Sequence, residues 1–181
     1  MLFKSQLINW LQRDPLCPDA LTVASTLQLN DWCLAAGFVR NLAWDKIHGF
    51  DMATPLNDLD LIYFDPNNLD EQKDKDLEVQ LMTLSDYPWS VKNQARMHIR
   101  NGHAPYKSTQ DAMSHWPEVE TAVGVRFDNN NNLELVTPFG VEGLFTNTIT
   151  LNSKFSNPDE FYNRIEEKGW LTKWPNLVVV R

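Results

Sequence analysis

Two stretches decide the fold: Trp32-Cys-Leu-Ala-Ala-Gly-Phe-Val-Arg-Asn-Leu42 and Asn57-Asp-Leu-Asp-Leu-Ile-Tyr-Phe64. The first is typical of a short buried strand that ends at Gly37 and leads into a helix with one apolar face. The second alternates polar and apolar residues before it becomes wholly apolar, which indicates a strand whose first half faces a polar cleft. We therefore predict strand, glycine turn, helix and strand, with Asp58 and Asp60 pointing the same way.

The rest of the chain adds helices and a hairpin around this unit. Apolar spacing predicts a helix that ends before Asp14-Pro15 and a second one over residues 21–29. Asp128-Asn-Asn-Asn-Asn132 joins two apolar runs and predicts a β-hairpin. Further helices are predicted over residues 70–84, 94–99, 109–115 and 158–168. This order favours an α+β fold, a mixed sheet flanked by helices.

The length of 181 residues suits a single domain. Within residues 1–181 we expect an N-terminal helical appendage over 1–30, a core over 31–146, and a C-terminal helix and tail over 147–181. No composition shift marks a second domain.

The composition is that of a folded globular protein, with 43% hydrophobic and 22% charged residues. The net charge of −8 weighs against binding to an extended nucleic acid, whose phosphates attract basic surfaces. The two cysteines form no disulfide or zinc pattern, and the first residues lack a signal-peptide core. No run approaches a membrane span. We expect a cytoplasmic protein with reduced thiols and no membrane association.

Two carboxylates on one face of a strand repel each other unless a cation lies between them. Asp58 and Asp60 therefore suit Mg²⁺, which binds a few carboxylates together with water and substrate phosphates. Gly37, with Arg40 and Asn41 behind it, opens a helix whose amide groups suit a phosphate. Neither GxxxxGK[ST] nor a GxGxxG after this strand is present, so P-loop and Rossmann folds are excluded. A polar strand edge is the structural alternative for the acidic pair.

These stretches carry a family resemblance. The run 36–42 followed by 56–61 resembles the head of the DNA polymerase β-like nucleotidyltransferase superfamily, and CCA-adding enzymes have a similar glycine, valine, arginine run. The stretch 32–145 is similar to the bacterial nucleotidyltransferase-like family DUF925. The motifs that carry this similarity are Trp89-Ser-Val-Lys-Asn-Gln-Ala-Arg-Met-His98, Ala104-Pro-Tyr106, Trp116-Pro-Glu118 and Pro138-Phe-Gly140.

The resemblance implies Mg²⁺-dependent nucleotidyl transfer with two ions held by Asp58, Asp60 and a third carboxylate. Leu133-Glu134-Leu135 matches the form of that third position, so Glu134 is the candidate, and an exposed hairpin glutamate is the alternative. Glu118 and Glu120 are rivals. One departure is Phe38, which stands where the superfamily has a second small residue and would crowd a triphosphate.

A change of charge follows the acidic pair. Residues 58–86 hold nine acidic residues and two lysines, whereas residues 87–110 hold no acidic residue. A local basic stretch in an acidic protein favours an anion site. With a helix beginning near Ser90, three side chains share one face and join the nucleotide site: Lys92, Asn93 and Arg96.

Three functions remain open from the sequence. The first is an enzyme that transfers a nucleoside monophosphate from a nucleoside triphosphate to an acceptor and releases pyrophosphate. The alternative is a catalytically weak or inactive nucleotide-binding module of the same fold. A two-metal phosphohydrolase is a third, weaker interpretation. The acceptor is a small molecule, a protein hydroxyl or an RNA end.

Overall fold

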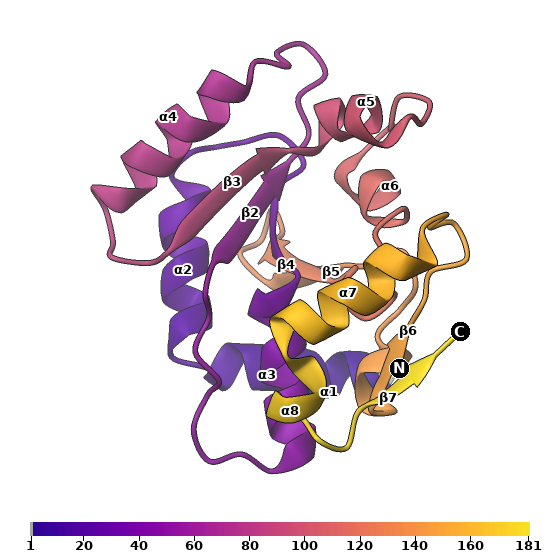
Figure 1. Cartoon of the computed structure of the whole chain (residues 1–181). Helices are drawn as coiled ribbons and strands as arrows, with labels where there is room; N and C mark the ends of the chain where they lie inside the picture. The colour runs from indigo at the N-terminus through magenta and orange to yellow at the C-terminus, as the bar shows by residue number, and fades with distance from the viewer. Residues whose placement is uncertain (1) are drawn as a thin grey trace.

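A computed structural model describes residues 2–181 and shows a mixed five-stranded sheet (Figure 1). The strand order is β3-β2-β1-β4-β5. β2 and β3 are parallel, and every other neighbouring pair is antiparallel. The strands are β1 (Cys33–Ala35), β2 (Leu59–Tyr63), β3 (Trp89–Asn93), β4 (Gly124–Phe127) and β5 (Leu133–Val136). The α+β class with a mixed sheet flanked by helices is confirmed.

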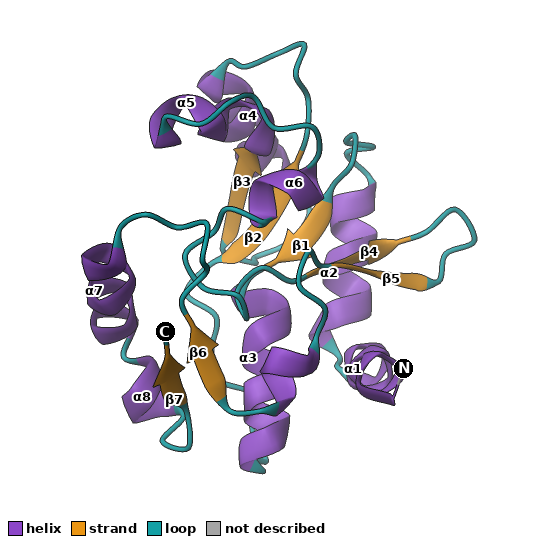
Figure 2. Ribbon diagram, turned by 90° about the vertical axis from the view of Figure 1, so that its right-hand side faces the viewer, coloured by secondary structure: helices purple, strands orange, loops and turns teal. Residues whose placement is uncertain are grey.

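Helices cover both faces of this sheet and extend beyond its edge (Figure 2). They are α1 (Leu2–Arg13), α2 (Leu16–Ser25), α3 (Gly37–His48), α4 (Glu71–Met82), α5 (Met97–Asn101), α6 (Thr109–Met113), α7 (Pro158–Lys168) and α8 (Trp170–Lys173). Short 3-10 turns are η1 (Gln94–Arg96) and η2 (Glu142–Phe145). Within residues 2–181, no helix combines the length and the apolar character that crossing a bilayer requires.

The main core lies on the sheet face formed by alternate residues such as Leu34, Leu61 and Val125. α3 contributes Phe38 and Val39 to it. The N-terminal helices, expected as an appendage, contribute to the same core with Leu7, Leu11, Cys17, Ala20 and Leu21, all fully buried. These helices therefore complete the hydrophobic core of the sheet.

The C-terminal segment forms a second hydrophobic cluster beside α3. Its two strands, β6 (Thr148–Thr150) and β7 (Val178–Val180), pair in parallel. Phe161 and Ile165 of α7 pack with Trp170 and Trp174 of the α8 segment. Trp44 of α3 is fully buried in the same cluster, so the C-terminal segment is held against α3 by aromatic packing.

Most of the predicted elements are confirmed. The hairpin joins β4 and β5 in register, with Arg126 opposite Glu134. Ser108 caps α6 by accepting a hydrogen bond from the Asp111 amide, and α7 ends at Gly169 with φ of 63°.

Two predicted boundaries are wrong. The second helix spans Leu16–Ser25 instead of residues 21–29, with Pro18 in its first turn, where a missing N–H leaves no helical hydrogen bond unmade. No helix begins near Ser90, because β3 continues through Asn93 in parallel pairing with β2.

Both cysteines are buried and free. Burial raises the pKa of the Cys17 thiol to about 12 and raises that of Cys33 as well. Neither thiol is therefore ionised at neutral pH.

The turn between β1 and α3 is strained. Ala36 has φ of 56° and ψ of −124°, a region that glycine occupies readily and alanine does not. Its backbone is held on both sides, because its amide donates to Val123 O and its carbonyl accepts from the Val39 and Arg40 amides. The surrounding hydrogen bonds thus hold Ala36, at the start of α3, in an energetically unfavourable backbone conformation.

We expect Ala36→Gly to raise the free energy of unfolding by about 1 kcal/mol, because strain relief exceeds the extra entropy of the unfolded chain. Urea denaturation measures the difference. Gly49→Ala is the opposite control: Gly49 has φ of 70° at the C-terminal end of α3, so alanine there lowers stability. A loss of stability in Ala36→Gly would contradict the strain argument.

Candidate functional site

Strand pairing places Asp60 on the sheet face opposite the main core. Asp60 pairs with Ala35 of β1, and Ala35 pairs with Gly124 of β4. Gly124 pairs with Val136, and on the other side Asp60 is opposite Ser90. These residues form one cross-strand row, and directly paired residues lie on the same face.

The acidic pair lies at the start of β2. Asp58 immediately precedes the strand and is exposed, whereas Asp60 is partly buried. Burial and the neighbouring Asp58 charge raise the pKa of Asp60 to about 6, while Arg40, Lys168 and Lys92 oppose that rise. The two carboxylates are therefore close enough to repel each other, as their spacing predicts.

The N-terminus of α3 adjoins this pair. The amides of Gly37 and Phe38, the first two helical residues, donate to no acceptor within residues 2–181, whereas those of Val39 and Arg40 bond to Ala36 O. A Cβ on Gly37 would lie 3.4 Å from Arg40 Nη2. Two free amides and a residue without a side chain suit the approach of an anion.

Phe38 does not crowd this helix end. Its side chain is buried in the main core with the apolar residues of the opposite sheet face. The Phe38 side chain therefore does not obstruct a triphosphate at this helix end. Phe38 still has no hydroxyl group that could bind one.

Arg40 is a buried cation behind the helix end. Its guanidinium donates to Thr121 Oγ1 at 2.7 Å and to Asn41 Oδ1 at 3.0 Å, and its Nε is buried without a partner. Burial lowers the pKa of Arg40 to about 10, while the charges of Glu118, Asp60 and Asp58 oppose that change. Arg40 is thus protonated at neutral pH.

The three basic-stretch residues do not share a face. Lys92 is opposite Ile62 and lies on the Asp60 face. Asn93 is the next residue of β3 and points to the other face, where it is fully buried. Arg96 forms an ion pair with the buried Asp74 of α4. Only Lys92 belongs with the acidic pair.

Asn93 organises a turn. Its side-chain amide donates to the carbonyls of Asp65 and Asn68, both at 2.9 Å, and its Oδ1 accepts from the amides of Asp65 and Ala95, both at 3.0 Å. Every hydrogen-bonding position of this amide is used within the protein. Asn93 therefore has no capacity left for a nucleotide.

Glu134 lies far from the acidic pair. β5 is three strand spacings from β2, which is roughly 14 Å between the backbones. The Glu134 carboxylate accepts from Arg126 Nε at 2.6 Å, and Arg126 also pairs with Asp31 at 2.8 Å. The structure does not bring Glu134 to Asp58 and Asp60.

The rivals of Glu134 are occupied as well. Glu118 is fully buried and accepts from Arg164 Nε at 2.7 Å. Glu120 accepts from the Thr150 amide at 2.7 Å and from the hydroxyls of Thr148 and Thr150. Both glutamates bind the C-terminal segment to the rest of the domain.

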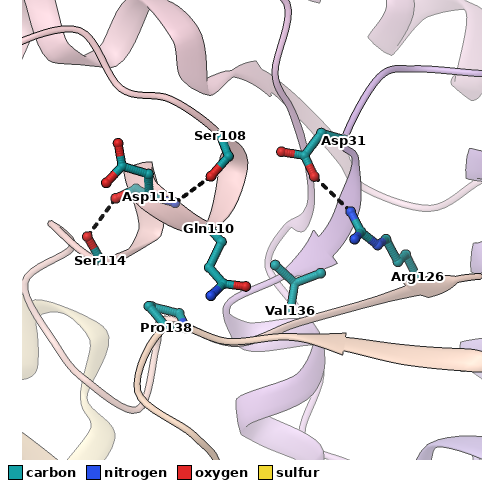
Figure 3. Close-up of a pocket in the computed structure, with 8 residues that line it drawn as sticks. All are labelled: Asp31, Ser108, Gln110, Asp111, Ser114, Arg126, Val136 and Pro138. Carbon is teal, nitrogen blue, oxygen red and sulfur yellow. Dashed lines mark hydrogen bonds and ion pairs between the residues drawn. The ribbon is translucent and has the colours of Figure 1, made fainter.

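A cavity of about 480 Å³ lies beside Arg126 (Figure 3). Its lining includes Gln110 of α6, Ser114 directly after α6 and Val136 of β5, together with the ion-paired Asp31 and Arg126. It does not contain the acidic pair. The same sheet face also carries a hydrophobic cluster: Cys33, Ala35, Ile62, Met113, Ala122 and Val136.

The donor set at the acidic pair fits Mg²⁺. Neither carboxylate accepts a hydrogen bond from any donor within residues 2–181. In that part of the chain, no three His, Cys, Asp or Glu side chains are grouped to hold a metal. Mg²⁺ commonly takes one or two protein carboxylates and completes its shell with water and substrate phosphates. Asp58 and Asp60 are the residues that would hold it.

Fold and site together define an α+β domain in which a helix N-terminus with two free amides adjoins a pair of carboxylates. The sequence profile of a family described as "Nucleotidyltransferase" matches residues 22–179. The chain belongs to this nucleotidyltransferase family. No functionally curated protein matches the sequence significantly.

Solved structures give the same fold. One, reported as an NMR structure that reveals a CCA-adding enzyme head domain, is 32% identical with a TM-score of 0.85, covering 97% of this chain and 94% of that chain. A tRNA-processing enzyme complex (TM-score 0.53) and a CCA-adding enzyme with CTP (TM-score 0.51) are each 11% identical. They cover 89% and 93% of this chain, which spans 42% and 47% of theirs. At that identity these two show the fold alone.

The C-terminal segment also contributes charges to the site, which the sequence did not predict. Lys168 acts on Asp60 electrostatically, and Arg164 lies near Arg40. Both residues are more than 100 positions from the acidic pair in the sequence. The only sequence signal was their spacing of four on a predicted helix, which places them on one side without saying what that side faces.

Asp60→Asn is expected to stabilise the protein above pH 6. The folded-state pKa of about 6 exceeds the unfolded value of about 4, so ionisation of Asp60 opposes folding once the pH passes these values. We expect a gain of about 1–3 kcal/mol at pH 8 that fades as the pH falls towards 4. Urea denaturation in metal-free buffer at both pH values measures it.

Asp65→Asn provides the control of opposite sign. A hydrogen bond from Lys73 lowers the pKa of Asp65, so this substitution destabilises at pH 8 and loses its effect as the pH falls. Equal stability of wild type and Asp60→Asn at pH 8 would show that Asp60 is not under electrostatic stress.

Proposed function

We propose that the protein transfers a nucleoside monophosphate from a nucleoside triphosphate to an acceptor, with Mg²⁺ required. One observation supports this most: Asp58 and Asp60 accept no hydrogen bond within residues 2–181 and lie beside the free amides of Gly37 and Phe38. Carboxylates for cations on one side and amides for an anion on the other suit a metal-bound triphosphate. Family membership supports the nucleotide as donor.

In the proposed reaction an acceptor hydroxyl oxygen attacks the α-phosphorus. The bond from the α-phosphorus to its bridging oxygen breaks, pyrophosphate leaves, and the hydroxyl proton passes to solvent. Asp58 and Asp60 would hold Mg²⁺, two ions in the proposed reaction, which when bound would stabilise the attacking and leaving oxygens. Glu134 has no part in this site, since its carboxylate is committed to Arg126.

The chain's own residues supply binding and orientation. Gly37 and Phe38 donate backbone N–H groups to a phosphate, and Arg40 adds a fixed positive charge behind the helix end. Asn41 Oδ1 accepts a hydrogen bond from that guanidinium and fixes its orientation. Lys92 lies on the same sheet face as Asp60 and offers a second cation.

One observation favours the alternative, a nucleotide-binding module without transfer. The acidic pair lacks a third carboxylate within residues 2–181, because Glu118, Glu120 and Glu134 are all bonded elsewhere. Such a module binds the nucleotide but releases no pyrophosphate. We propose that the acceptor is a small molecule, a protein hydroxyl or an RNA end. We also propose that the protein is cytoplasmic.

The first test is binding of a non-hydrolysable nucleoside triphosphate, measured by calorimetry with and without Mg²⁺. We expect Mg²⁺-dependent binding by the wild type and at least tenfold weaker binding by Asp58→Asn and Asp60→Asn, since each loses a charged ligand. Glu134→Gln is the matched control and should bind like the wild type. No Mg²⁺-dependent binding by the wild type would contradict the proposal.

Turnover separates the enzyme from the binding module. Pyrophosphate release from each of the four nucleoside triphosphates is measured against a panel of hydroxyl acceptors. Release that disappears in Asp58→Asn supports transfer. Tight binding without release for any acceptor in the panel favours the module.

A further inference from the structure

The last turn of α7 presents two cations on one side. Arg164 and Lys168 are four residues apart, which places them on the same side of the helix. Phe161 and Ile165 lie on the same i, i+3, i+4, i+7 stripe and are buried in the C-terminal cluster, so this side of α7 faces the rest of the domain. α7 and α8 lie along one side of α3 in Figure 2 and in front of it in Figure 1.

Arg164 anchors this side of α7 next to the proposed site. Its Nε donates to Glu118 Oε1 at 2.7 Å and its Nη2 to Glu118 Oε2 at 3.4 Å. Glu118 is fully buried, and its charge also acts on Arg40. One buried carboxylate therefore lies between a cation of α7 and the cation behind the helix end of α3.

Aromatic packing fixes the segment that follows α7. The Arg40 guanidinium lies 4.4 Å from the Trp170 ring centre and 5.0 Å from that of Trp44. The two indole rings are 5.8 Å apart and meet edge to face. Gly169 joins Lys168 to Trp170, so the residue before this turn is held close to Arg40.

Lys168 differs from Arg164 because it has no partner. It forms no hydrogen bond or ion pair within residues 2–181, although it lies near enough to the acidic pair to act on Asp60. A long, exposed, unpaired cation near the acidic pair suits the outer phosphates of a nucleotide, which carry most of its charge.

We propose that Lys168 binds the β- and γ-phosphates of the nucleoside triphosphate, so that α7 completes the nucleotide site. This inference rests on the proposed function and adds a binding residue from the C-terminal segment. Its specific content is discrimination: Lys168 favours a triphosphate over a monophosphate, whose single phosphate lies at the α position.

The test compares Lys168→Met with Lys168→Arg and with Lys173→Met. Lys173 lies on α8, so Lys173→Met removes the same charge from the same C-terminal segment. Calorimetry measures the affinity of each variant for a non-hydrolysable triphosphate and for the matching monophosphate, in Mg²⁺. We expect Lys168→Met to weaken triphosphate binding by about tenfold, as loss of one charged hydrogen bond does, and to leave monophosphate binding unchanged.

The controls decide between binding and structure. Lys168→Arg should restore most of the triphosphate affinity, and Lys173→Met should match the wild type. Equal weakening for both nucleotides, or equal effects of Lys168→Met and Lys173→Met, would overturn the inference. If the wild type binds Mg²⁺-triphosphate through Asp58 and Lys168→Met is unaltered, the inference fails alone. If the wild type binds no nucleotide, it fails together with the proposed function.

Discussion

Burial of the Arg40 guanidinium is the constraint on which the site depends. Arg40 is 7% exposed, and an unpaired buried cation is strongly destabilising. The protein compensates with the Thr121 hydroxyl, the Asn41 amide, two indole faces and the nearby negative charge of Glu118. These groups come from α3, from the segment before β4 and from α8. A single cation thus requires the sheet, α3 and the C-terminal segment to be assembled together.

The same constraint explains why charges of both signs gather on one side of an acidic protein. Asp58 and Asp60 lower the cost of burying Arg40, and Arg40 in turn stabilises the ionised form of Asp60. This compensation is incomplete, because the pKa of Asp60 still lies near 6. The remaining electrostatic stress is what a divalent cation between the carboxylates would relieve, so metal affinity and a modest loss of stability have one cause.

Local sequence patterns predicted the elements better than the partnerships between them. The strand before Gly37, the alternation at Asp58 and Asp60, and the hairpin all follow from the properties of neighbouring residues. Asn93 was misplaced because residues 89–93 form a strand and not the start of a helix, and successive residues of a strand face opposite sides of the sheet. Lys92 and Asn93 are adjacent in the sequence, yet Lys92 lies on the face of the site and Asn93 bonds to a turn on the other face.

Long-range contacts account for the other misses. The tripeptide around Glu134 has the form of a third carboxylate, but only the strand order β3-β2-β1-β4-β5 reveals that β5 is the far edge of the sheet from β2. Lys168 and Arg164 present the opposite case: they have no suggestive local pattern, yet they lie near the site. Their helix is remote in sequence and reaches the site through Glu118 and Trp170, contacts that no local periodicity encodes.

Phe38 shows how a bulky residue is compatible with a helix end that leaves its first amides free. Its backbone belongs to the helix end, while its side chain lies in the main core. Because Ala36 takes a positive φ, the chain turns sharply, so the free amides of Gly37 and Phe38 adjoin the acidic pair while the Phe38 ring packs away from it. The small residue that binding demands is therefore Gly37, where a side chain would meet Arg40, and the position after it is free to serve the core.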